Sequence, residues 1–171
     1  MEDFYISSIF TELINFELET IYLYISMINF SLTKANPDLY NFLIYRLNKK
    51  NKSLQLLLKY LSYYHVRFCF KDIKLLQTSW KSSFECINNI YIHEKFYLEK
   101  LKYAKDALKR YRLTELFFFI ERNICLQKRY LKILKKTIVF KYIYQNRALK
   151  GQLYPGSRQA LHVEQFPQVN N

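Results

Sequence analysis

The sequence predicts an all-α protein: a four-helix bundle in which one long connection separates two helix pairs. Apolar residues recur in four stretches at steps of three and four, which places them along one face of each helix. The 171 residues include only 2 Gly and 3 Pro, so few residues interrupt helices. This length is enough for one domain with a substantial core.

The first two predicted helices run from Asp3 to Asn29 and from Pro37 to Tyr64. The polar stretch SLTKANPD separates them, and Pro37 suits the first turn of the second helix. A short link of this kind makes two helices antiparallel. The apolar row of the first helix contains an acid: Phe10, Leu13, Ile14, Glu17, Ile21, Tyr24 and Ile28. The row of the second helix is Leu43, Leu47, Leu54, Leu57 and Leu61.

The second pair is predicted from Trp80 to Arg110 and from Thr114 to Tyr144. Thr114 is a suitable N-cap, and Glu115 after it complements the helix dipole. The connection before this pair, residues 65–79, is long for a hairpin between helices and contains an extended candidate, VRFCF. A crossover of this length makes the second and third helices parallel. The third row is Phe84, Ile87, Tyr91, Glu94, Leu98 and Leu101, and the fourth is Leu113, Phe117, Ile120, Ile124, Leu131, Leu134 and Ile138.

The composition changes after residue 144. Residues 145–171 hold both glycines and two of the three prolines. We therefore predict a bundle over residues 1–144 and a loose tail over residues 145–171, with one short helical turn near residues 159–164.

The net charge of +13 raises the question of a nucleic-acid or membrane-surface partner. Lys is abundant together with Asn, Ile, Phe and Tyr, and basic residues are expected on all four helices, so nucleic acid ranks last among the functions considered. No apolar stretch is long enough to span a membrane, and the start MEDFYISS does not resemble a signal peptide. The separated Cys69, Cys86 and Cys125 indicate reduced thiols in a cytoplasmic protein.

Glu17 and Glu94 are the candidate functional residues, because each interrupts an apolar row and a buried carboxylate needs compensation. Inward carboxylates on facing helices can build a di-iron site, with Glu-x-x-His pairs on other helices. No Glu in this chain has a His three residues later. His65 falls in the connection, His93 points about 100° away from Glu94, and His162 falls in the tail. The alternative is that each Glu bonds a nearby Lys or Tyr, with Tyr22, Tyr24 and Tyr91 as the available phenols.

Five segments occur in the order found in ferritin, and the chain resembles a diverged animal ferritin of the heavy-chain kind. The segment LINFELETIYLYISM (13–27) resembles the first ferritin helix, and FIERNICLQKRYLKIL (119–134) resembles the fourth. Between them, LYNFLIYRL (39–47), KDIK (71–74) and HEKFYLEKL (93–101) resemble the second helix, the crossover and the third helix. The tail does not resemble the fifth helix of that family.

The resemblance implies that Glu17 and Glu94 match iron ligands and that Tyr24 lines the site. It also implies that three ligand positions are lost: Ser53 stands where a bridging Glu should be, Leu56 where a His should be, and Lys128 where a Gln should be. Iron is then bound weakly or not at all. The position of the Lys128 ammonium is then the most informative observation: if it points at the two glutamates, a salt-bridged plug has replaced the metal.

These observations lead to a ferritin-like iron-storage subunit with a degenerate ferroxidase centre. It would act by co-assembly with other ferritin chains, in a cage of up to two dozen chains by resemblance. As an enzyme it would be a ferroxidase by kinship but inactive. The first alternative is an active ferroxidase that oxidises Fe²⁺ for storage, and the second is a basic helical protein that binds nucleic acid.

Overall fold

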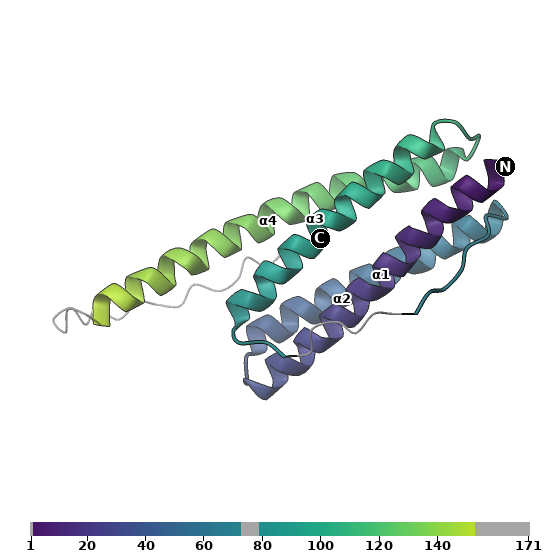
Figure 1. The fold of residues 1–171 in the computed structure, drawn as a ribbon. Helices are drawn as coiled ribbons and strands as arrows, with labels where there is room; N and C mark the ends of the chain where they lie inside the picture. The colour runs from purple at the N-terminus through teal and green to yellow at the C-terminus, as the bar shows by residue number, and fades with distance from the viewer. Residues whose placement is uncertain (1, 73–78, 153–171) are drawn as a thin grey trace.

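The computed structural model describes residues 2–72 and 79–152, with side chains described for residues 4–72 and 79–139. It contains α1 (Glu2–Thr33), α2 (Pro37–Tyr63), α3 (Ser83–Leu108) and α4 (Thr114–Gln152), as Figure 1 shows. The described residues form no strand. The all-α bundle predicted from the sequence is confirmed.

The four helices lie side by side and form an elongated bundle (Figure 1). α1 and α2 are antiparallel, as are α3 and α4, and the connection after α2 returns along the molecule so that α2 and α3 are parallel. α1 packs against α2 and α3, and α4 packs against α3 and α2. The predicted crossover therefore has the expected effect on helix direction.

Side-chain caps fix where two of the helices begin. The Asn36 side chain accepts a hydrogen bond of 3.0 Å from the Leu39 N–H, and Pro37 follows at the first helical position. Ser82 accepts one of 3.1 Å from the Glu85 N–H, so α3 begins at Ser83 and not at Trp80. The Trp80 indole is buried against α1, where its Nε1 donates to the Ser26 hydroxyl at 2.9 Å.

The first part of the long connection follows α1 and is held there by polar side chains. The Asn15 amide donates to the Cys69 carbonyl at 2.8 Å and accepts from the Lys71 N–H at 2.7 Å. The Thr11 hydroxyl accepts from the Cys69 N–H at 3.1 Å. The extended candidate VRFCF does not form a strand, and at Cys69 two α1 side chains bond the backbone N–H and C=O groups in place of a neighbouring strand.

The core consists of two apolar clusters with a polar layer at mid-length. One cluster includes Phe10, Leu57, Leu101 and Ile120, and the other includes Met27, Leu43, Ile87 and Leu134. The buried polar and charged residues of this layer are Glu17, Lys50, Glu94 and Gln127. All four helices contribute one of these side chains, so the layer lies where the whole bundle meets.

The fourth helix is longer than the sequence predicted, since α4 continues past Tyr144 to Gln152. The helical turn predicted near residues 159–164 and His162 lie outside the described residues. The loose tail therefore remains a prediction for residues 153–171.

No disulfide joins Cys69, Cys86 and Cys125 in the described structure, and their reduced state stays a prediction. Cys86 is buried, whereas Cys69 and Cys125 are exposed. Among the described helices, none has a stretch both long and apolar enough to traverse a lipid bilayer.

Candidate functional site

Glu17 of α1 and Glu94 of α3 meet in the polar layer. Their exposed fractions are 1% and 0%. Each belongs to an apolar helix row, so the packing that buries its neighbours also carries the carboxylate into the core. The structure thus brings together the two acids that the sequence singled out.

Lys50 of α2 lies between these two carboxylates. Its Nζ is 3.1 Å from Glu17 Oε2 and 3.0 Å from Glu94 Oε2, and the side chain is 4% exposed. The ammonium also lies 3.5 Å from the centre of the Tyr97 ring, where the negative face of the ring favours a cation. A single buried lysine therefore bridges the two acids from above an aromatic ring.

Glu94 has further partners, so both of its oxygens are bonded. The Tyr24 hydroxyl donates to Oε1 at 2.8 Å, and Gln127 Nε2 donates to Oε2 at 2.7 Å. Arg46 Nη2 lies 3.7 Å from Oε1, and its guanidinium stacks 3.2 Å from the centre of the Tyr130 ring. Tyr130 in turn hydrogen-bonds Tyr24 at 3.0 Å.

The two carboxyls differ in acidity because their partners differ. Burial raises the pKa of Glu17 above its usual 4.5, and the attraction of Lys50 only partly offsets this. Burial acts on Glu94 in the same direction, but Lys50 and Arg46 together hold the pKa of Glu94 below 4.5. Within the described residues no group donates a hydrogen bond to Glu17 Oε1, so Glu17 is the less well compensated acid.

His93 does not join the pocket, although it is adjacent to Glu94 in the sequence. Its ring stacks on Phe16 with centroids 4.4 Å apart, and its Nδ1 lies 3.2 Å from the Thr20 hydroxyl. Burial lowers the pKa of His93 to about 4, so the imidazole is neutral at pH 7. It serves as a packing residue between α1 and α3.

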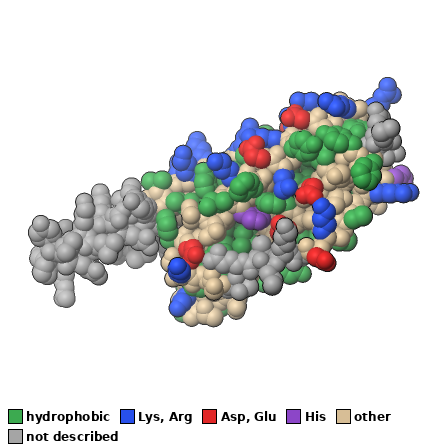
Figure 2. Space-filling view, viewed as in Figure 1, with side chains coloured by type: hydrophobic (Ala, Val, Ile, Leu, Met, Phe, Trp, Pro, Cys, Tyr) green, Lys and Arg blue, Asp and Glu red, His purple; other side chains and the backbone are tan. Residues whose placement is uncertain are grey.

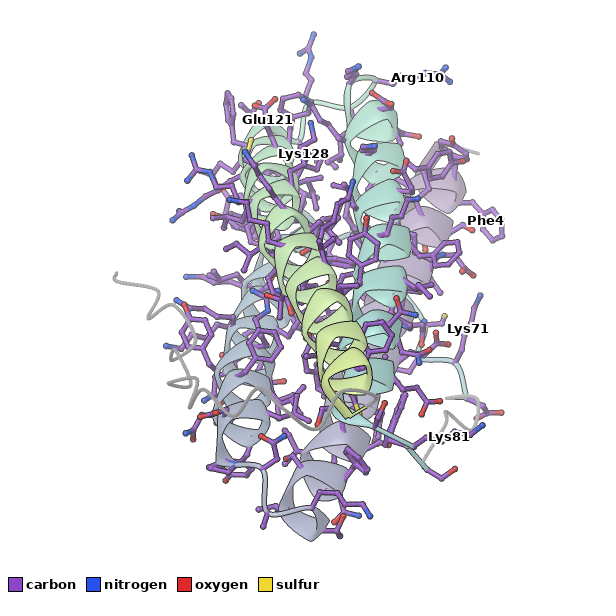
Figure 3. All side chains as sticks on the ribbon, turned by 90° about the vertical axis from the view of Figure 1, so that its left-hand side faces the viewer. Phe4, Lys71, Lys81, Arg110, Glu121 and Lys128 are labelled. Atoms are coloured by element: carbon purple, nitrogen blue, oxygen red, sulfur yellow. The ribbon has the colours of Figure 1, made fainter. Side chains whose placement is uncertain are left out.

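The structure places the three supposed lost ligand positions differently from the sequence prediction. Lys128 is exposed on α4, so its ammonium does not fill the pocket (Figure 3). Leu56 is 48% exposed and does not face the two glutamates. Ser53 is half-buried and donates to Asn123 Oδ1 at 3.1 Å. The ammonium that does lie between the two glutamates is that of Lys50.

Three residues of the pocket were not identified from the sequence: Lys50, Arg46 and Gln127. A signal for two of them was present in the apolar rows. The second row steps from Leu43 to Leu47 by four, and a step of three then reaches Lys50 before Leu54. The fourth row likewise alternates steps of four and three, and this alternation reaches residue 127, not 128, after Ile124. Three residues after Lys50, the half-buried Ser53 lies toward α4, where it bonds Asn123.

The donor set of this pocket does not fit a di-iron centre. Such a centre takes a Glu from each of two helices and a Glu-x-x-His pair from each of the others. Here Lys50 and Ser53 occupy the Glu-x-x-His spacing on α2, and α4 presents Gln127. Among the residues with described side chains, no group of three or more His, Cys, Asp or Glu is arranged to hold a metal ion. Tyr24, predicted to line the site, does lie against Glu94.

The fold is that of solved ferritins. A Chlorobium tepidum ferritin is 18% identical with a TM-score of 0.74, and the match covers 89% of this chain and 97% of that one. A humanized archaeal ferritin is 16% identical, with a TM-score of 0.75 and coverages of 92% and 97%. An open-pore ferritin from Archaeoglobus fulgidus is 14% identical, with a TM-score of 0.71 and coverages of 78% and 82%.

The sequence matches no protein-family model and no curated protein. Because the identities to the solved structures are below 20%, the similarity establishes the fold, and kinship with animal heavy chains stays a prediction. The chain has the four-helix fold of a ferritin subunit.

Proposed function

We propose that this chain is a ferritin-like subunit in which an internal salt bridge replaces the iron-oxidising centre, and that it acts as a structural chain beside other ferritin subunits. One observation carries the proposal: the Lys50 ammonium lies within 3.1 Å of both Glu17 and Glu94. That is where a cation shared by the two carboxylates would lie.

The charges of the pocket explain why Fe²⁺, as substrate, would bind weakly there. Glu17 and Glu94 supply two negative charges, and Lys50 and Arg46 supply two positive charges. A balanced pocket has no excess negative charge to attract a divalent ion. Iron would have to displace a cation that is covalently attached to α2, and the displaced ammonium would then be buried without its partners.

The purified chain should oxidise Fe²⁺ no faster than the buffer does. The reason is that only two carboxylates are available and both are occupied by Lys50. Stopped-flow absorbance after mixing with ferrous salt, compared with buffer alone, measures this. A rate well above the buffer rate would support the active-ferroxidase alternative and contradict the proposal.

The partner of the proposed subunit follows from charge. At +13 per chain, many identical copies in a closed assembly would repel one another. We expect the chain alone to form no stable complete cage at physiological salt, and mixing with an acidic ferritin chain to give mixed cages. Native mass spectrometry of the chain alone and of the mixture measures both. A stable cage of this chain alone would argue against co-assembly as its role.

A further inference from the structure

The positive charge of the described helices is distributed unevenly. α1 contains no Lys or Arg, so the expectation of basic residues on all four helices is wrong. Along the edge of the molecule where α4 runs, Figure 2 shows Lys and Arg side chains gathered. One helix is therefore without basic residues, and a one-sided group of basic residues, which is what nucleic-acid binding requires, can form on the others.

The lysines of α3 are largely neutralised by acids. Lys102 lies 2.7 Å from Glu99 on the same helix, and Lys109, the residue directly after α3, lies 2.7 Å from Asp106. Lys105 pairs with Glu121 of α4. The α3 surface therefore carries less net positive charge than its number of lysines suggests.

The outward sides of α2 and α4 carry basic residues that are not neutralised in this way. We call them the basic face, and its members are Lys49, Lys52, Lys59, Arg122, Arg129, Lys132 and Lys136. All are exposed. No Asp or Glu with a described side chain lies within ion-pair distance of any of them; the observed pairs involve other residues.

The two helices that form the basic face are in direct contact. Ser53 bonds Asn123 at 3.1 Å, and the rings of Tyr60 and Phe119 lie 5.2 Å apart. The sides of α2 and α4 that flank these contacts therefore adjoin on one surface. The α2 ridge repeats at steps of four and three through exposed side chains: Tyr45, Lys49, Lys52, Leu56, Lys59 and Tyr63.

Exposed aromatic rings accompany the charges. Tyr63 and Phe118 are 68% and 59% exposed, and the Lys49 ammonium lies 5.4 Å from the centre of the exposed Tyr45 ring. Basic side chains that follow a phosphate backbone, combined with rings on which unpaired bases stack, are the two components of single-strand binding. A duplex would leave these rings without a base to stack on.

We infer that the basic face binds single-stranded nucleic acid, through phosphate contacts from the α2 and α4 lysines and arginines and base stacking on the exposed tyrosines. This function is independent of the pocket at Lys50, which lies inside the bundle. A result against either one leaves the other standing.

The test is fluorescence anisotropy with a labelled single strand of about 20 nucleotides, longer than the roughly 4–16 that comparable sites cover. Binding should be measurable at low salt. The logarithm of the binding constant should fall linearly with the logarithm of the salt concentration, with a slope whose magnitude is ~0.7 per phosphate contact. Lys49→Glu with Lys52→Glu, and separately Arg129→Glu with Lys132→Glu, should each lower the slope by roughly 1.4. All four side chains are exposed, so circular dichroism should show an unchanged fold.

The matched control is Lys102→Glu with Lys109→Glu, which makes the same charge change on α3. This pair should leave the slope nearly unchanged. Tyr63→Ala should weaken binding, whereas Phe4→Ala, at a ring that is 81% exposed on α1, should not. The inference is overturned if no binding occurs at low salt or if the α3 control weakens binding as much as the α2 and α4 pairs. Equal affinity for polyphosphate, or tighter binding to anionic vesicles, would also overturn it.

Discussion

The double variant Lys50→Glu with Ser53→His should gain ferrous oxidation at least about ten-fold above the buffer rate, equivalent to a barrier about 1.4 kcal/mol lower. The change removes the cation and places a Glu-x-x-His pair at the inward positions of α2. Together with Glu17 and Glu94 it supplies three carboxylates and an imidazole, that is, both single Glu ligands and one of the two Glu-x-x-His pairs of a carboxylate-bridged di-iron site. Gln127 already lies 2.7 Å from Glu94 and stays in place.

A matched control distinguishes the effect of the pocket from the effect of adding a Glu and a His anywhere on α2. Lys52→Glu with Gln55→His makes the same charge change and the same Glu-x-x-His spacing, but both positions are exposed on α2. This variant should remain at the buffer rate. Stopped-flow oxidation and calorimetric titration with Fe²⁺ compare the two variants. If the pocket and surface variants oxidise and bind Fe²⁺ equally, the Lys50 ammonium is not what keeps iron out of the buried layer.

Lys50→Met should lower the free energy of unfolding by about 3–5 kcal/mol, because it leaves two buried carboxylates that have lost their shared cation. For a chain of this length the melting temperature would fall by roughly 6–20 °C, at about 2–4 °C per kcal/mol. Thermal unfolding followed by circular dichroism measures the change. The exposed neighbour provides the comparison, since Lys49→Met should alter stability by no more than about 0.5 kcal/mol.

The pH dependence of the stability of Lys50→Met shows whether the buried carboxylates cause the loss. Without the ammonium, burial raises the folded-state pKa of Glu17 further above 4.5, so the folded state binds a proton there more readily than the unfolded chain. The loss of stability should therefore be largest near pH 7 and shrink as pH falls toward 4.5. In the wild type, the lowered pKa of Glu94 gives a stabilising contribution that is present above pH 4.5 and lost below it. A pH-independent loss in the variant would indicate lost packing alone.

The sequence was sufficient to predict the bundle, its crossover and the inward acids, because these follow from local periodicity. Glu17 and Glu94 stood out because an acid within an apolar row is conspicuous. Lys50 did not, because it lies between Lys49 and Lys52, and such a run is typical of a solvated face. Its burial depends on carboxylates contributed by α1 and α3, more than thirty residues away, so only the packed structure reveals it.

The sequence could not show which residues of α2 and α4 face the two glutamates, and the reason is geometric. A spacing of three residues is the same for Lys50 and Ser53 as for Ser53 and Leu56, so spacing alone cannot decide which pair faces inward. The contact between Ser53 and Asn123 decides it, and the exposure of Leu56 agrees. On α4 the choice of inward residue was between the neighbours Gln127 and Lys128. The hydrogen bond from Gln127 to Glu94 shows that Gln127 faces the pocket.

Asn15 ties residues 69–71 to the middle of α1, and this has a consequence for how the bundle opens. The amide protons of Cys69 and Lys71, although outside any helix, exchange with solvent only when the connection leaves α1. Detachment there would free the segment that joins the two helical hairpins. Deuterium uptake at these two amides should therefore report hairpin separation, at a slower rate than fraying of the helix ends.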